Sequence, residues 1–155
     1  MTSESRTTEK LSGPCVQQFS IFLQNKVGAL LDIVKVLNER HIHVLALNVQ
    51  DSADSSIVRI VASDPEQVQD LFALHDIPYA TCDLVVVELK EGASELGKLL
   101  VALLMAEVNI HGSYALMSRP RGSCALALHV EDNECASAVL RSHGFPLLSQ
   151  ADLTR

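Results

Sequence analysis

The residues best suited to chemistry form the stretch Asn25–Leu30, Asn-Lys-Val-Gly-Ala-Leu, at the expected start of a helix. Gly28 permits a tight turn out of the preceding strand, because glycine adopts backbone angles that strain other residues. The first N–H groups of the helix have no partner inside it and lie at its positive end. Such a turn suits a small carboxylate, although an isolated glycine often does no more than make the turn.

Histidine, cysteine and serine residues suggest other sites, and none is completed by its neighbours. His41 and His43 lie on one side of an expected strand, but no obvious ligand set surrounds them, so surface histidines are the better interpretation. The four cysteines lack Cys-x-x-Cys spacing, which favours free buried thiols over zinc or disulfides. The serines of 52–56 have no base placed by a recognisable motif. We therefore expect no metal, no cofactor, no catalytic residue and no enzyme activity.

The elements that position the glycine turn follow the order β-α-β-β-α-β. The apolar pattern predicts strands at Val16–Leu23, Ile42–Val49 and Ile57–Ala62, and a fourth strand after Pro78. Helices are predicted at 28–40 and at 64–75, where Asp64-Pro65-Glu66-Gln67 is a capping-box start. Such a unit forms a four-stranded antiparallel sheet with both helices on one face.

The second half of the chain repeats the first. Ile42-His43 matches Ile110-His111, and Asp64 matches Asp132, at a constant shift of 68 residues. The repeat predicts two more helices, at 95–107 and 132–143. It divides the chain into a flexible tail (1–14), a first domain (15–82) and a second domain (83–155).

The chain resembles the ACT domain, an amino-acid-sensing module of metabolic enzymes. The resemblance is carried by Asn25–Leu30 with its helix, and by Glu107-Val108-Asn109-Ile110 in the second copy. It covers about Val16 to Leu153 and implies an α+β fold of two ferredoxin-like βαββαβ units side by side, with antiparallel sheets and helices on one face. Two such units commonly share an eight-stranded sheet.

In that family an effector amino acid binds between the glycine loop of one unit and the second strand of its neighbour. The resemblance therefore implies the following ligand-binding residues: Asn25, Lys26, Val27, Gly28, Ala29 and Leu30, with Asn109, Ile110 and His111. Val27 stands where proline is common. The reciprocal loop looks weaker, because the shift places Leu96 at the position of Gly28, and Gly97 comes one residue late. Glu91 and Glu95 would also repel a carboxylate.

Composition excludes several classes of partner. The net charge of −7 argues against nucleic acid and against an anionic membrane surface. No apolar run approaches eighteen residues and no signal-peptide core is present, which predicts a cytoplasmic protein.

The helix around Leu99–Ala106 is apolar on all sides. We expect Leu96, Leu99, Leu100 and Leu103 to face the sheet, and Val101, Leu104 and Met105 to form a homodimer interface.

The sequence thus predicts a non-enzymatic regulatory protein that binds an amino acid or similar small carboxylate between two ACT domains. The alternative is a regulatory subunit that docks onto a separate enzyme of amino-acid metabolism without a ligand of its own. A metal carrier or small enzyme of the same topology would need residue pairs that the sequence does not show.

Overall fold

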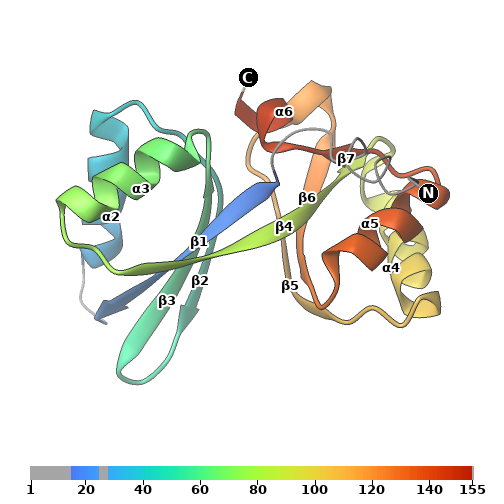
Figure 1. The fold of residues 1–155 in the computed structure, drawn as a ribbon, viewed down its shortest axis with the longest axis horizontal. Coiled ribbons are helices and arrows are strands. Elements are labelled where there is room, and N and C mark those ends of the chain that lie inside the picture. The colour runs from blue at the N-terminus through green and yellow to red at the C-terminus, as the bar shows by residue number, and fades with distance from the viewer. Residues whose placement is uncertain (1–14, 25–27, 155) are drawn as a thin grey trace, which may run out of the picture.

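The computed structural model describes residues 15–24 and 28–154, which form two βαββαβ units (Figure 1). Unit 1 consists of β1 (Val16–Gln24), α2 (Ala29–Glu39), β2 (Val44–Asp51), β3 (Ser55–Ala62), α3 (Pro65–Leu74) and the first half of β4 (Tyr79–Leu89). Unit 2 consists of the rest of β4, η1 (Gly92–Glu95), α4 (Leu96–Met105), β5 (Ile110–Ala115), η2 (Pro120–Gly122), β6 (Cys124–Val130), α5 (Asn133–Ser142), β7 (Leu147–Leu148) and α6 (Gln150–Thr154). The predicted fold class and the four predicted helices are confirmed. The tail at 1–14 lies outside the described residues.

Strand β4 belongs to both units. Its residues Tyr79–Leu84 pair with β1, and its residues Val85–Leu89 pair with β6, while β7 pairs with Val86 and Val87. One sheet of order β2-β3-β1-β4-β6-β5 results, with β7 beside β4. The described strands therefore number seven rather than the eight implied by the resemblance, because one long strand does the work of two. The expected boundary between residues 82 and 83 falls inside this strand.

The helices lie on the outer sides and the two halves of the sheet face each other between them (Figure 1). Each unit has its own core between sheet and helices: Val58, Ile60 and Ala62 belong to the first, as predicted. A third cluster joins the opposite faces of the two half-sheets, and it includes Leu45, Val61, Leu84, Leu116 and Ala127. The sheet face left open in one unit is thus covered by the other unit, which removes apolar surface from water.

Two of the helices begin at side-chain caps, as the sequence predicts for α3. Asp64 Oδ1 accepts a hydrogen bond from Gln67 N (3.2 Å), and Gln67 Nε2 donates to Asp64 Oδ2 (2.8 Å). Asp132 caps α5 in the same way by accepting from Cys135 N (3.0 Å). Such a cap contributes ~1 kcal/mol, because it satisfies an N–H group that the helix leaves unpaired.

The duplication is confirmed, but the constant shift of 68 residues is wrong in the first half of each unit. His41 and Glu107 occupy the same left-handed turn, with φ of 58° and 57°. The next residue closes that turn in both units: Ile42 N donates to Leu37 O, and Val108 N donates to Leu103 O, both at 3.0 Å. These pairs are 66 residues apart.

The shift of 68 holds only from the third strand of each unit onward, as the Asp64 and Asp132 caps show. The connection between β5 and β6 absorbs the two extra residues. Ile42 therefore corresponds to Val108 rather than Ile110, and Gly28 corresponds to Ser94 rather than Leu96. The repeated Ile-His dipeptide is a coincidence of sequence.

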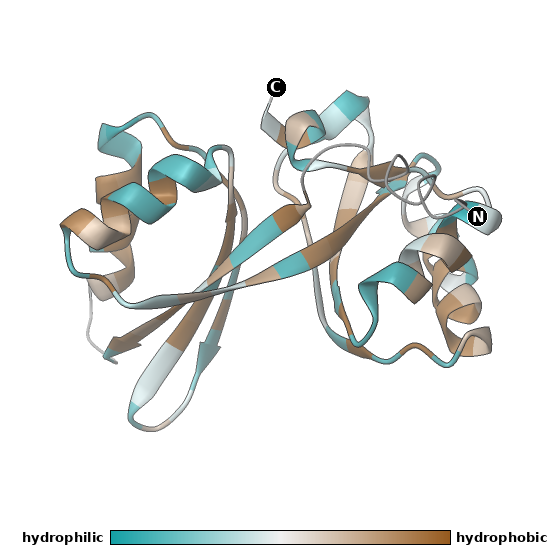
Figure 2. Ribbon diagram, in the orientation of Figure 1, coloured by the Kyte–Doolittle hydropathy of each residue, from teal (hydrophilic) through white to brown (hydrophobic). Residues whose placement is uncertain are grey.

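Helix α4 is only half covered, which corrects part of the prediction. Leu99 and Leu103 are buried as expected, together with Ala102, whereas Leu96 and Leu100 are 39% and 44% exposed. Val101, Leu104 and Met105 are 57%, 74% and 78% exposed, as expected. Figure 2 shows the resulting hydrophobic colour along this helix. Within residues 15–24 and 28–154, no helix is long and apolar enough to cross a membrane.

Candidate functional site

The start of α2 has the open form that the sequence predicts. Gly28 is the N-cap and adopts φ 92° and ψ −12°, and its carbonyl accepts from Asp32 N (2.9 Å). An added Cβ would meet no atom within 4 Å, so glycine is needed here for its backbone angle rather than for space. Because glycine has no side chain to cap the helix, the first N–H groups of α2 are left for water or a ligand. Asn25–Val27 lie outside the described residues.

The second set of predicted residues lies at the start of β5. Asn109 is exposed, its Nδ2 donates to Glu131 Oε1 (3.3 Å), and its carbonyl accepts from Glu131 N (2.9 Å). Ile110 packs against the core of unit 2. His111 is exposed, with its ring centroid 5.4 Å from that of His129.

The two sets do not touch in the described part of one chain. Leu30 packs against the core of unit 1, whereas Ile110 packs against the core of unit 2. No hydrogen bond between described residues joins Gly28–Leu30 to Asn109–His111. In Figure 1, α2 lies at the outer side of unit 1 and β5 lies in the opposite unit.

The corresponding turn of unit 2 is closed. The 3₁₀ turn η1 precedes α4, and Glu95 Oε2 accepts a hydrogen bond from Glu91 N (2.6 Å). Ser94 Oγ also donates to Glu91 O (2.9 Å). Gly97 lies within α4 and has no left-handed φ, so it does not substitute for the glycine of the first turn. A carboxylate of the chain itself already satisfies this turn.

A polar network between the facing sheets was not predicted. Tyr114 OH donates to Gln18 Oε1 (2.7 Å), and Gln18 Nε2 donates to Cys82 Sγ (3.3 Å). Burial raises the pKa of Tyr114 above its ordinary value of 10.0, so the phenol stays protonated and donates this bond. Burial, and then the neighbouring Asp83 carboxylate, raises the pKa of Cys82, which keeps it a thiol rather than a nucleophilic thiolate.

Two histidines and an arginine extend this network. Burial, His111 and Arg59 together lower the pKa of His129 below 6.5, so its imidazole is neutral at pH 7. Arg59 Nη1 donates to Gln50 Oε1 (3.0 Å). Strand periodicity predicts that Arg59 points away from the helices, because its neighbours Val58 and Ile60 point toward them. The sequence gave no sign that the opposite sheet would cover that side.

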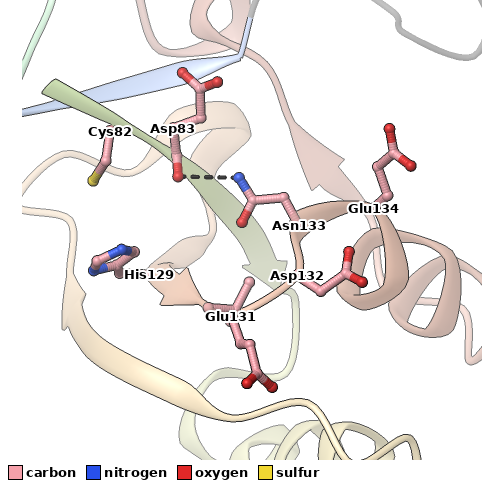
Figure 3. A pocket seen from close by; sticks show the side chains of 8 residues that line it. Cys82, Asp83, His129, Glu131, Asp132, Asn133 and Glu134 are labelled. Atoms are coloured by element: carbon pink, nitrogen blue, oxygen red, sulfur yellow. Dashed lines mark hydrogen bonds between the residues drawn. The ribbon is translucent and has the colours of Figure 1, made fainter.

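A hollow of about 580 Å³, here called the β4 hollow, opens beside these residues (Figure 3). It is lined by Cys82, Asp83, His129, Val130, Glu131, Asp132, Asn133 and Glu134. Asn133 Nδ2 donates to the main-chain oxygen of Asp83 (3.1 Å) and so joins the start of α5 to the edge of β4. Figure 3 shows the Cys82 thiol on the same side as the His129 ring, with Glu131 and Asp132 on the other side.

A second hollow of about 650 Å³ lies at the start of α3 and includes Asp64, Glu66, Asp83 and Gln150. Its α3 side corresponds to the α5 side of the β4 hollow, since Asp64 and Asp132 are equivalent caps. Helix α6 closes it: Gln150 Nε2 donates to Ala62 O (3.0 Å), and Thr154 Oγ1 donates to Ser63 O (2.8 Å). Among the described residues, no group of three or more His, Cys, Asp or Glu side chains is placed to hold a metal.

Comparison with known proteins gives one family. The family model of an "ACT domain pair" matches residues 14–154. Protein BT0572 from Bacteroides thetaiotaomicron has a similar structure, with a TM-score of 0.82, 26% identity, and coverage of 91% of this chain and 96% of that chain. The ligand-free regulatory subunit of aspartate kinase from Thermus thermophilus shares the fold, with a TM-score of 0.58, 16% identity, and coverage of 86% and 93%. No curated protein sequence matches the chain.

Proposed function

The chain belongs to the family of ACT domain pairs, and from this we propose that it is a cytoplasmic regulatory protein that binds an amino acid or a similar small carboxylate between ACT units. ACT domains are regulatory rather than catalytic in this family. The observation that carries the proposal is the start of α2. There a left-handed glycine leaves helix N–H groups uncapped, whereas α3 and α5 are capped by aspartates.

The ligand carboxylate accepts hydrogen bonds from the N–H groups at the start of α2, where the helix dipole also favours negative charge. The proposed contacts on this side are Asn25, Lys26, Val27, Gly28, Ala29 and Leu30. The polar groups of Asn109 and His111, with Ile110 between them, are the proposed contacts from the second unit. Support for this side is narrower: Asn109 is exposed, and its amide holds only one carboxylate.

A thermal-shift screen against the twenty amino acids tests the proposal. A ligand at a hundred times its Kd stabilises the fold by about 2.7 kcal/mol, which raises the midpoint by roughly 5 °C for a protein of this size. Gly28→Ala is expected to abolish that rise. Gly97→Ala is the matched control, since Gly97 has helical backbone angles in the equivalent helix.

The alternative function is a subunit that controls a separate enzyme through its surface and has no ligand. The exposed apolar side of α4 favours it, because soluble monomers seldom leave such a patch uncovered. The fold shared with regulatory subunits of aspartate kinase is compatible with it. A melting midpoint that none of the twenty amino acids moves would favour this alternative over the sensor.

We also propose that a second copy of the chain covers α4. The exposed face formed by Leu100, Val101, Leu104 and Met105 is flanked by Lys98 at one end and by Glu107 at the other. Antiparallel pairing of two α4 helices about a twofold axis places each lysine near the partner's glutamate. Sedimentation as a dimer at micromolar concentration supports this pairing, and sedimentation as a monomer contradicts it.

A further inference from the structure

The two facing half-sheets carry positive charge where they begin to separate. On unit 1, Arg59 pairs across the sheet with Ser20 and with Asn48. On unit 2, His129 pairs with Gly112. The dry cluster between the units ends near these residues, so this level of the interface is polar and half-exposed.

A hydrogen bond fixes how the two faces are aligned. Tyr114 OH of β5 donates to Gln18 Oε1 of β1 at 2.7 Å. One side-chain step farther from the dry cluster, β1 presents Ser20 beside Arg59, while β6 presents His129 after Ala127. Arg59 therefore faces the His129–His111 pair, and its charge reaches both His129 and Cys82, the two residues that line the inner side of the β4 hollow.

The hydrogen-bonding capacity of Arg59 is mostly unused. A guanidinium has five N–H donors, and in the described residues one nitrogen bonds to Gln50. Among the residues that the structure describes, no carboxylate lies within 4.0 Å of Arg59, and the salt bridge found there joins Arg121 to Asp152. A partly covered guanidinium is best matched by a planar carboxylate that accepts two parallel hydrogen bonds.

The outer side of the β4 hollow selects among such carboxylates. Glu131 and Asp132 line it, and both are exposed. They repel a ligand with two or more negative charges, and they favour a ligand that carries an ammonium group on the side opposite its carboxylate. A small amino-acid zwitterion has this charge arrangement, and a hollow of about 580 Å³ has room for it.

We propose that the β4 hollow is a second amino-acid site, in which Arg59 and His129 bind the carboxylate and Glu131 and Asp132 face the ammonium group. Nothing in it depends on the start of α2. It shares with the proposed function only the class of ligand. Because Arg59 lies on unit 1 and His129 on unit 2, a bound zwitterion bridges the two units and holds them together.

Glycine, the smallest amino-acid zwitterion, is the probe for this site, and the NMR signals of the His129 ring are the readout in the full chain. We expect saturable shifts with glycine. Acetate, which lacks the ammonium group, and methylamine, which lacks the carboxylate, are expected to act far more weakly. Arg59→Gln is expected to weaken the glycine response about tenfold, because a charge-assisted hydrogen bond to the carboxylate is lost.

Two control variants separate this site from others. Arg119→Gln removes an exposed arginine elsewhere and is expected to leave the response unchanged. Gly28→Ala is expected to leave it unchanged too, so failure of the α2 site and failure of this site give different results. The proposal is overturned if sodium chloride at equal ionic strength moves the His129 signals as glycine does, or if Arg59→Gln responds like the wild type. In either case Arg59 is simply a solvated side chain.

Discussion

Helices α2 and α4 are equivalent elements of the duplicated unit, and they have diverged in opposite ways. Helix α2 begins at a left-handed glycine with uncapped N–H groups, and its exposed side is polar apart from Leu31. Helix α4 begins behind a turn closed by the Glu95 carboxylate, and its exposed side is apolar. The end of one helix is left open for a ligand, while the side of the other is left open for a protein surface. Duplication thus allowed one copy of the element to bind small molecules and the other to associate.

The largest effect should come from placing a charge on the exposed side of α4. Leu104→Glu is expected to weaken the proposed dimer by about 2 kcal/mol or more, roughly 30-fold, because a charge would be buried without a partner. Leu31→Glu is the matched change on α2, where 54% of the side chain is exposed, and it is expected to have no effect on assembly. Sedimentation equilibrium measures both. Equal weakening by the two variants would show that the helices do not differ in this way.

A glycine exchange distinguishes the two helix starts. Gly28→Ala is expected to lower the free energy of unfolding by about 1–2 kcal/mol, because alanine is strained at φ 92°. Gly97→Ala is expected to raise it by about 0.5 kcal/mol, since alanine favours the helical angles found there. Chemical denaturation of both variants gives the comparison, and effects of the same sign would contradict it.

The closed turn of unit 2 should open when its carboxylate is removed. Glu95→Ala frees Glu91 N–H and is expected to lower the free energy of unfolding by about 0.5–1 kcal/mol. Glu66→Ala, on the exposed first turn of α3, serves as a control with little expected effect. If the Glu95 variant is as stable as the wild type, the carboxylate does not close this turn in solution.

The smallest effect concerns the interface that both units share, where the two halves should respond together. The pKa of His129 in the folded state lies below 6.5, so the unfolded chain binds more protons near that pH. The stability that this residue contributes is therefore complete above about pH 6.5 and declines as the pH falls. Denaturation at several pH values checks the direction. His129→Gln should flatten the dependence in both units, and a change confined to one unit would argue against a shared interface.

Local rules predicted most of the fold. Asp64, Pro65 and Gln67 marked the start of α3, and alternation in β3 correctly assigned Val58 and Ile60 to the helix side. The repeat was real, but the matching Ile-His dipeptides hid a change of shift from 68 to 66 residues. That change is visible only in the turns at His41 and Glu107.

Contacts between distant segments were beyond local rules. That β4 serves two units depends on which strands lie on each edge of it, and the pattern of a single strand does not contain this information. The same is true of Arg59, whose side of the strand was predictable but whose neighbour His129 lies in the other unit. Of the candidate ligand site, the glycine turn was predicted from sequence, and the network between the sheets was not.

Amide NMR during an amino-acid titration tests the central claim most directly, namely that the start of α2 binds the ligand and the start of α4 does not. We predict saturable shifts of the N–H signals of Gly28, Ala29 and Leu30, with the signals of Leu96, Gly97 and Lys98 unchanged. Shifts at the start of α4 alone, equal shifts at both helices, or no response to any of the twenty amino acids would contradict the account.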